Sequence, residues 1–331
     1  MKLKDRFGRI HNYVRISLID KCNLNCIYCN PTGSNSFFFP NKVILSYEEL
    51  YRLIKVLVGI LDVRKIRFTG GEPLIRKGVL KFFEMISELK SYYDFEIGIT
   101  TNGTNLLDKL KPLQQFGVEL LNISLDSLDR NKFVAITGKD KLEEVILSIE
   151  KAIETGFKSV KINTVVMKGF NDDELIPLIN YFKSYPVSLR FIEYMPFANN
   201  RWEEEKFISW QSMKEIIESS LHLIEEGNAG LISKDFKVDG TSLNVGFISS
   251  ISNNFCDSCN RLRITATGHI KVCLFSKPAE ASLKPLLGDL SVSDEKIAEF
   301  ILEILQSKWE KHPDISELLE LKANHMMTIG G

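Results

Sequence analysis

Apolar, β-branched runs of strand length recur through the first part of the chain, and amphipathic helical patterns separate them. The runs predict strands at residues 14–18, 65–69, 95–100, 119–125, 160–166 and 188–194. The patterns between them predict helices at 46–61, 77–90, 106–116, 141–154 and 172–185. The first helix has a clear start signal, because Ser46 and Glu49 can form a capping box. Gly117 and Gly156 follow two of the others, where helices commonly end.

Strands that alternate with helices predict parallel βα units. Six such units are too few for a closed eight-stranded barrel. The expected fold class is therefore α/β, an incomplete (β/α)6 TIM-type barrel. In barrels of this type the chemistry lies beyond the C-terminal ends of the strands.

The periodicity changes after the sixth predicted strand. A helical pattern at 212–221, short strand-like pieces, a hairpin at 267–268 and a helix at 294–311 follow. We expect this smaller α+β region to cover the open side of the barrel. The expected division is 1–195 for the partial barrel and 196–331 for the C-terminal region.

The charge balance narrows the function classes. The formal net charge is −1 and the pI is near 6.6, so no global basic field would hold nucleic acid or an anionic membrane. Residues 1–12 lack the apolar run of a secretory signal, and no apolar stretch reaches the roughly 20 residues of a membrane span. A cytoplasmic chain is expected. In a reducing compartment, clustered cysteines favour metal or redox sites over disulfides.

All six cysteines fall into two triplets. Cys22, Cys26 and Cys29 have the spacing C-x3-C-x2-C and follow directly on the first predicted strand. A [4Fe–4S] cluster usually takes four thiolates, so three leave one iron open to a non-protein ligand such as S-adenosylmethionine (SAM). A structural zinc site is the alternative. It is disfavoured because such sites have four closed ligands, and no nearby histidine supplies the fourth.

The second triplet consists of Cys256, Cys259 and Cys273, with the spacing C-x2-C-x13-C. It again predicts a cluster with an open iron, here able to bind a substrate nitrogen or oxygen. Arg261 and Arg263 are two residues apart, so on a strand they point the same way. With Arg15 of the first strand as a third cation, they would form an anion site suited to phosphates.

The first triplet, at this place in a βα barrel, resembles the signature of the radical SAM superfamily. Residues 69–73 (Thr-Gly-Gly-Glu-Pro) follow the second predicted strand and resemble the superfamily's motif that contacts the methionine end of SAM. Glycines there permit a close approach of the backbone. The resemblance implies reductive cleavage of SAM to a 5′-deoxyadenosyl radical.

Over nearly its whole length the chain is similar to the family of GTP 3′,8-cyclases of molybdenum cofactor biosynthesis. The second triplet with its Arg-x-Arg insert and the final Gly330-Gly331 carry this resemblance. It implies two [4Fe–4S] clusters, SAM as cofactor, and conversion of GTP to (8S)-3′,8-cyclo-7,8-dihydroguanosine 5′-triphosphate. The adenosyl radical would take the ribose 3′ hydrogen, and the resulting carbon radical would attack C8 of guanine.

The resemblance also implies roles for individual residues. Catalytic roles fall to Arg15, Arg261, Arg263, Gly330 and Gly331. Contacts with SAM fall to Tyr28, Gly71, Ser124 and Met195. Contacts with GTP fall to Arg15, Arg67, Thr100, Lys161, Arg261, Leu262 and Arg263, with Asn260 beside them. The cluster ligands are Cys22, Cys26 and Cys29 in the first site and Cys256, Cys259 and Cys273 in the second.

The implied partners are GTP, an electron donor such as a flavodoxin or ferredoxin system, and cyclic pyranopterin monophosphate synthase, which would take the product. No nucleic acid and no membrane are expected, and the chain would be a monomer or a homodimer. Lys21, where arginine is usual, and Asn30, where methionine is common, depart from the family pattern. No arginine follows Arg263, which leaves the docking of the tail open.

Two alternatives stay open. One is a different radical SAM enzyme with an auxiliary cluster, although such extensions usually carry more than three cysteines. The other is a non-catalytic iron–sulfur or zinc protein. A non-catalytic protein of that class would not explain the presence of the Gly-Gly-Glu-Pro segment or of the paired arginines.

Overall fold

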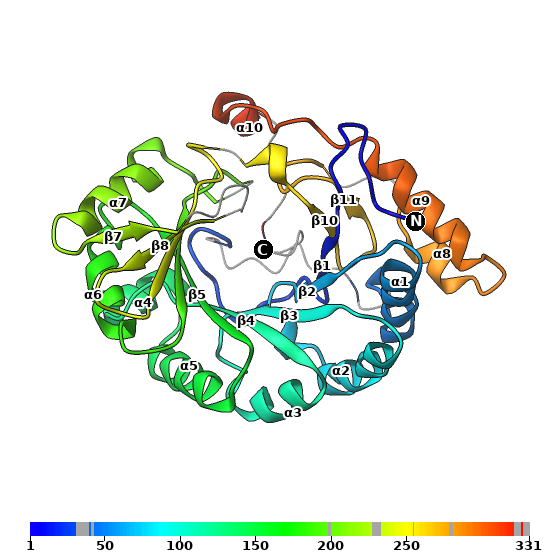
Figure 1. Ribbon diagram of the computed structural model, residues 1–331, viewed down its shortest axis with the longest axis horizontal. Helices are drawn as coiled ribbons and strands as arrows, with labels where there is room; N and C mark the ends of the chain where they lie inside the picture. The colour runs from blue at the N-terminus through cyan, green and yellow to red at the C-terminus, as the bar shows by residue number, and fades with distance from the viewer. Residues whose placement is uncertain are drawn as a thin grey trace.

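The computed structural model describes residues 1–30, 40, 43–197, 200–226, 233–253, 255–277, 281–320 and 326. A single eleven-stranded sheet curves around the centre of the molecule, and helices cover its outer face (Figure 1). The strand order is β11-β10-β1-β2-β3-β4-β5-β6-β9-β8-β7. The predicted α/β partial barrel is confirmed.

The six predicted strands are β1 (Tyr13–Ser17), β2 (Lys65–Thr69), β3 (Glu96–Thr101), β4 (Val118–Ser124), β5 (Ser159–Val166) and β6 (Ser188–Glu193). Each pairs in parallel with the next. The C-terminal region adds β7 (Leu223–Glu225), β8 (Lys234–Val238), β9 (Asn244–Ile248), β10 (Arg261–Ile264) and β11 (Ile270–Lys271).

The C-terminal region extends the barrel at both edges of its sheet. Strand β9 pairs in parallel with β6, and β10 pairs in parallel with β1, so the parallel part of the sheet runs from β10 through β1–β6 to β9. The remaining pairs are antiparallel, and that of β10 with β11 is the predicted hairpin. The outermost strands β11 and β7 are not hydrogen-bonded to each other, so the described sheet stays open.

Ten α-helices occur in the described part of the chain: α1 (Tyr47–Gly59), α2 (Val79–Ser87), α3 (Leu110–Gln115), α4 (Arg130–Thr137), α5 (Leu142–Thr155), α6 (Leu175–Phe182), α7 (Trp210–Glu218), α8 (Lys284–Gly288), α9 (Asp294–Leu305) and α10 (Ile315–Glu320). The predicted capping box is present, because Ser46 Oγ accepts from the amide of Glu49 and the Glu49 carboxylate accepts from the amide of Ser46. Gly156 ends α5 in the left-handed region at a φ of 83°. Helix α4 was not predicted. None of the described helices is long and apolar enough to cross a membrane.

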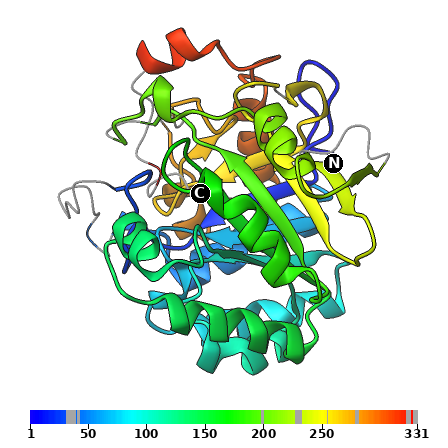
Figure 2. The same cartoon turned by 90° about the vertical axis from the view of Figure 1, so that its left-hand side faces the viewer.

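The two faces of the barrel strands differ in chemistry. Val14 and Ile16 of β1 and Ile66 and Phe68 of β2 are completely buried in the main hydrophobic core. The helices lie against the outer face of the sheet, as the side view also shows (Figure 2). The alternate positions on the same strands therefore face the interior of the barrel.

Candidate active site

A cavity of about 680 Å³ occupies the interior of the barrel. It reaches from Tyr13, Lys65 and Ser159, the first residues of their strands, to Thr101 and Ser124 at the C-terminal ends. Most predicted site residues line it, namely Arg15, Cys22, Cys26, Tyr28, Cys29, Arg67, Gly71, Thr100, Ser124, Lys161, Met195, Asn260, Arg261 and Arg263. Gly330 and Gly331 lie outside the described residues.

The first triplet lies in the loop after β1, at the C-terminal mouth of the barrel. The end of helix α4 holds the backbone of this loop. The amides of Asn25 and Ile27 donate to the carbonyls of Thr137 and Ile136, at 2.9 Å each. The Cys22 sulfur accepts from the side-chain amide of Asn102 at 3.7 Å. The sequence folds the loop so that all three thiols face one cavity.

The thiols of the first triplet interact through their charges. Burial raises the pKa of Cys22 to about 11 and raises the pKa values of Cys26 and Cys29, and the neighbouring thiolates add to the last two shifts. No group of three histidine, cysteine, aspartate or glutamate side chains among the described residues is arranged to hold a single metal ion. A [4Fe–4S] cluster binds each thiolate at a separate iron, so its three ligands need not converge on a single ion.

The Gly-Gly-Glu-Pro segment packs directly on the cysteine loop. A Cβ at Gly71 would lie 2.2 Å from the carbonyl oxygen of Lys21, and one at Gly70 would lie 2.5 Å from that of Ile19. The buried Glu72 carboxylate accepts from Thr101 Oγ1 at 2.8 Å and from the Asn102 amide at 2.7 Å. Burial raises the pKa of Glu72 to about 7. Only glycine permits this close approach, so the segment is a wall of the cavity and not an ordinary turn.

Changing Gly71 to alanine is expected to weaken the site sterically. The added methyl group would clash with the backbone of the cysteine loop and lower the free energy of unfolding by about 1–3 kcal/mol. SAM affinity, measured by isothermal titration of the reconstituted protein, should fall with it. Gly288→Ala is the matched control, because its Cβ would meet its nearest atom at an ordinary 3.4 Å. SAM binding of wild-type strength in Gly71→Ala would contradict the expectation.

Two residues that the sequence reasoning missed hold the predicted SAM contacts Tyr28 and Met195. The Tyr28 hydroxyl donates to Asp126 Oδ2 at 2.7 Å, and burial raises the pKa of Asp126 to about 6. The Asn200 side-chain amide donates to the carbonyls of Tyr28 at 3.3 Å and Met195 at 2.8 Å. A carboxylate two residues after β4 was the available signal for Asp126, because barrel sites gather at strand ends.

Cations stand side by side on adjacent strands. Arg15 of β1 lies in register with Arg263 of β10 on one side and Arg67 of β2 on the other. Burial, followed by the charge of Arg261, lowers the pKa of Arg263 to about 10. Against opposing burial, the positive charges of Arg67, Arg15 and Arg261 lower the pKa of Tyr13 to about 7. These guanidinium groups create a strongly positive interior that a polyanion would neutralise.

Several polar atoms that face the cavity have no hydrogen-bond partner within the described protein. They are Arg15 Nε, Thr69 Oγ1, Thr100 Oγ1, Asn122 Oδ1, Asn163 Oδ1, Arg190 Nε, Ser233 Oγ and Arg261 Nε. Buried polar groups are normally paired, because an unpaired one costs about 1–3 kcal/mol. Their concentration around one cavity fits a polar, anionic ligand.

Three cations that line this cavity, Lys65, Lys158 and Arg190, were not predicted. Arg190 lies on β6 and Lys65 begins β2. Lys161 of β5 was predicted, and burial together with the charge of Arg190 lowers the pKa of Lys161 to about 8. The alternation of the strands carried the signal, since charged residues at inward positions of otherwise apolar runs need an internal partner.

The second triplet lines a smaller cavity of about 60 Å³ next to the first. Arg261 and Arg263 line both cavities and so lie between the second triplet and the barrel interior. Cys256 belongs to the short 3-10 helix η7 (Cys256–Ser258), and Cys259 follows it. Burial opposes ionisation of Cys259, but nearby cations, Lys308 first among them, lower its pKa.

Leu262 is the predicted GTP contact that the structure does not bring to the cavity. Its side chain is completely buried in the main hydrophobic core, on the opposite face of β10 from Arg261 and Arg263. Adjacent strand residues point to opposite faces, so a leucine between two inward arginines must point outward. Only the main chain of Leu262 is available for a contact with substrate.

Comparison with known proteins agrees with this geometry. The sequence model of the radical SAM superfamily matches residues 16–182, and that of Molybdenum Cofactor Synthesis C matches residues 187–313. SuiB of Streptococcus suis, solved bound to S-adenosylmethionine, shares the fold at a TM-score of 0.59 and 15% identity, over 87% of this chain and 66% of that chain. The barrel and its first triplet thus define a radical SAM enzyme.

Similar proteins of known name indicate which family of radical SAM enzymes the chain belongs to. A GTP 3′,8-cyclase of Thermodesulfovibrio yellowstonii is 40% identical over 99% of this chain and 100% of its own length. Molybdenum cofactor biosynthesis protein 1 of Dictyostelium discoideum is 43% identical over 99% of this chain and 52% of its own length. The chain spans about half the length of the latter and of the corresponding Drosophila melanogaster protein. The chain belongs to the family of GTP 3′,8-cyclases, whose cofactors are SAM and two [4Fe–4S] clusters.

Proposed function

We propose that the chain is itself a GTP 3′,8-cyclase that acts in molybdenum cofactor biosynthesis. The observation that carries the proposal is one cavity with the first cysteine triplet at its mouth, the second triplet next to it, and a set of buried cations between them. A GTP molecule offers a triphosphate to the cations and a guanine base to the second triplet. Neither alternative from the sequence accounts for this charge.

The cations would hold the triphosphate. Arg67 is already fixed, because its guanidinium donates to the Tyr13 hydroxyl at 2.9 Å and to the carbonyl of Ile99 at 2.8 Å. Lys161 and Arg190 line the same cavity, and burial lowers the pKa values of both, although the charge of Asp235 opposes these shifts. Substrate binding would therefore relieve electrostatic strain that the folded protein carries, which makes the cation cluster selective for a polyanion.

Arg261 and Arg263, together with Asn260, would orient the base and ribose toward the second triplet. Arg261 and Arg263 line both cavities, and Asn260 lines the larger one. Three thiolates leave one iron of the second cluster open, and a guanine nitrogen or oxygen could bind there. Anchoring both ends of the nucleotide would fix its ribose beside the first triplet, and this positioning is the main contribution of the protein.

Gly71, Tyr28, Ser124 and Met195 would hold SAM at the first triplet. Bound there beside a reduced cluster, SAM would supply the radical chemistry that takes a hydrogen atom from the ribose of GTP.

The proposal also covers the organisation of the chain and its partners. The partial barrel would end near residue 195, and Gly330 and Gly331 would have catalytic roles. A flavodoxin or ferredoxin system would donate the electron, and a cyclic pyranopterin monophosphate synthase would take the product.

One anaerobic reaction tests the proposal. The reconstituted chain is given dithionite, SAM and GTP, and the products are analysed by liquid chromatography and mass spectrometry. Both 5′-deoxyadenosine and the cyclised nucleotide are expected. Formation of 5′-deoxyadenosine alone would refute the cyclase and leave the radical enzyme, and no 5′-deoxyadenosine from protein with both clusters would refute both.

The KM for GTP is expected to rise as the pH increases above about 8. Lys161 has a pKa lowered to about 8, so it is charged below this pH and neutral above it. Only the charged form attracts the triphosphate, so alkaline pH removes binding energy. The KM is measured from pH 7 to 9, and Lys161→Arg is the control. A guanidinium stays charged throughout, so the rise should be smaller in this variant; an identical rise in both proteins would exclude Lys161 as its cause.

A further inference from the structure

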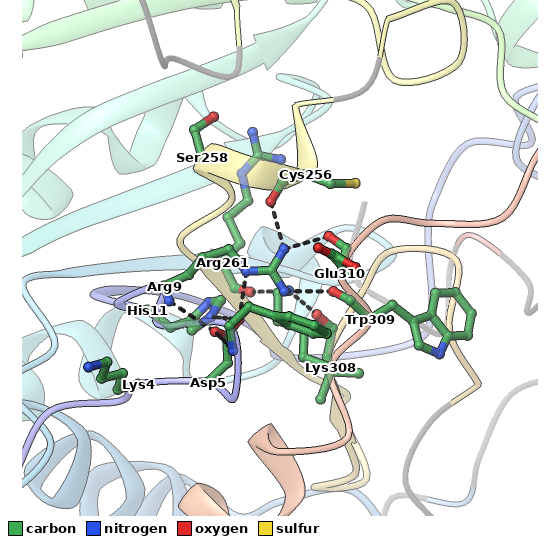
Figure 3. Close-up of polar contacts among 12 residues, drawn as sticks. Lys4, Asp5, Arg9, His11, Cys256, Ser258, Arg261, Lys308, Trp309 and Glu310 are labelled. Carbon is green, nitrogen blue, oxygen red and sulfur yellow. Dashed lines mark hydrogen bonds and ion pairs between the residues drawn. The ribbon is translucent and has the colours of Figure 1, made fainter.

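Two cations outside the main cavity bind the backbone at the second triplet. Arg9 lies in the N-terminal segment and donates to the carbonyl of Cys256 (Figure 3). Lys308 lies just after α9 and donates to the carbonyls of Arg261 and Val272, which flank the other two cysteines. Neither belongs to the machinery described above. Both interactions span long stretches of sequence, 247 residues between Arg9 and Cys256.

The Arg9 guanidinium joins three segments. Nη1 donates to the carbonyl of Cys256 at 2.8 Å and to that of Glu310 at 2.7 Å, while Nη2 donates to the carbonyl of Trp309 at 2.6 Å. Nε donates to Asp5 Oδ2 at 2.6 Å. The Arg9 side chain is only 11% exposed, and its bonds to Cys256, Trp309 and Asp5 are partly buried. The guanidinium is therefore held in one orientation toward a ligand residue of the cluster.

Asp5 fixes Arg9 in turn. Its Oδ1 accepts from the backbone amides of Phe7 at 3.0 Å and Arg9 at 2.9 Å, and its Oδ2 lies 3.0 Å from His11 Nε2. The side chains of Asp5 and His11 are fully buried. A buried carboxylate with several donors has one stable position, so the N-terminal segment acts as a rigid support for Arg9.

Lys308 binds the backbone near the other two cysteines, at the start of β10 and just after β11. Its Nζ donates to the carbonyl of Arg261 at 3.3 Å, two residues after Cys259, and to the carbonyl of Val272, the residue before Cys273. Lys308 is 3% exposed and lines the 60 Å³ cavity together with the three thiols. Arg9 and Lys308 thus contact the backbone within two residues of each of the three ligand positions.

We propose that Arg9 and Lys308 are positioning residues for the second cluster: they hold the three ligand segments in place before the cluster binds, and Lys308 sets its reduction potential. This inference rests on the proposed function, because it requires that the second triplet hold a cluster. Groups that orient metal ligands commonly contribute roughly 10–100-fold to metal affinity. A buried cation next to an anionic cluster stabilises the reduced, more negative form, so its removal makes reduction harder.

The test uses the full-length chain with Cys22, Cys26 and Cys29 changed to alanine, so that any cluster signal comes from the second triplet. After anaerobic reconstitution, iron release to a chelator and the midpoint potential are measured by absorption and electron paramagnetic resonance. Arg9→Gln and Lys308→Met should release iron roughly 10-fold faster. Lys308→Met should also shift the potential to a more negative value, whereas Lys308→Arg should restore it.

Arg52 provides the matched control for a purely structural role. Its guanidinium binds the Asp294 carboxylate and the carbonyls of Leu286, Leu287, Asp289 and Val292, and so also ties the C-terminal region to the barrel. Arg52→Gln should lower the melting temperature without changing either cluster measurement. If Arg9→Gln does not fold, Arg9→Lys and Asp5→Asn replace it, with circular dichroism as the check.

The possible outcomes distinguish the presence of a second cluster from the roles of Arg9 and Lys308. Failure of the triple-alanine chain to take up any iron would refute the second cluster and this inference with it. A loaded cluster with wild-type release and potential in both Arg9→Gln and Lys308→Met would refute the inference alone. Equal changes in Arg52→Gln would also refute it, because they would show a general effect of stability.

Discussion

Replacing Cys29 by serine is expected to abolish both 5′-deoxyadenosine and the cyclised nucleotide. The thiolate is the ligand that iron–sulfur clusters require, and a serine hydroxyl does not ionise in its place. With two ligands left in the first triplet, the first cluster should not assemble. Iron in the reconstituted protein should fall from about eight to about four atoms per chain.

Cys273→Ser is the matched control, because it removes one ligand from the other triplet. It should lose a similar amount of iron and fail to cyclise GTP, yet still form 5′-deoxyadenosine slowly from SAM. The two variants together assign radical formation to one triplet and substrate positioning to the other. Measurable 5′-deoxyadenosine from Cys29→Ser would contradict this assignment.

The barrel was predictable because its information is local. Buried parallel strands appear in the sequence as runs of β-branched residues. The helices between them show recognisable capping residues, such as Ser46 with Glu49. The two cysteine triplets were predictable from their spacing alone. Arg15 and Arg263 were found through a strand-alternation argument and the family resemblance, and the structure places them in register on neighbouring strands.

The features that escaped prediction depend on long-range contacts. Strands β9 and β10 extend the parallel sheet at its two edges, but each is only four or five residues long, and its partner strand cannot be identified from its own sequence. Arg9 lies in a polar segment that carries no motif. Its importance appears only when the fold brings it to Cys256.

The direction of side chains on the strands was the other reason why the predicted site and the observed cavity lining differ. Arg190, Asn122 and Asn163 occupy inward positions on β6, β4 and β5, where the runs are otherwise apolar. That alternation was visible in the sequence once the strands were assigned. Leu262 shows the reverse, since its neighbours on β10 face inward and it faces the core. Resemblance to relatives indicates which residue contacts the substrate. The alternation of side chains along the strand determines whether the contact can involve the side chain or only the main chain.

Arg263→Gln is expected to reduce kcat/KM for GTP by about two to four orders of magnitude. Arg263 is 4% exposed, lies in register with Arg15, and has a pKa lowered to about 10 by burial and the charge of Arg261. Its charge is therefore costly in the free protein and becomes favourable when a phosphate or the polar edge of the base binds. Losing one partner of such a buried pair costs about 3–5 kcal/mol, which corresponds to the expected loss of rate.

The direction of the stability change distinguishes this electrostatic account from simple damage to the fold. Removing one of several mutually repelling cations should leave the melting temperature of the free protein unchanged or raised, while the stabilisation by added GTP should largely disappear. Arg64→Gln, at an arginine whose side chain is 54% exposed and which pairs with Asp62, is the control and should change neither quantity. A free Arg263→Gln protein that melts well below wild type yet keeps its stabilisation by GTP would show that Arg263 supports the fold and does not bind the substrate.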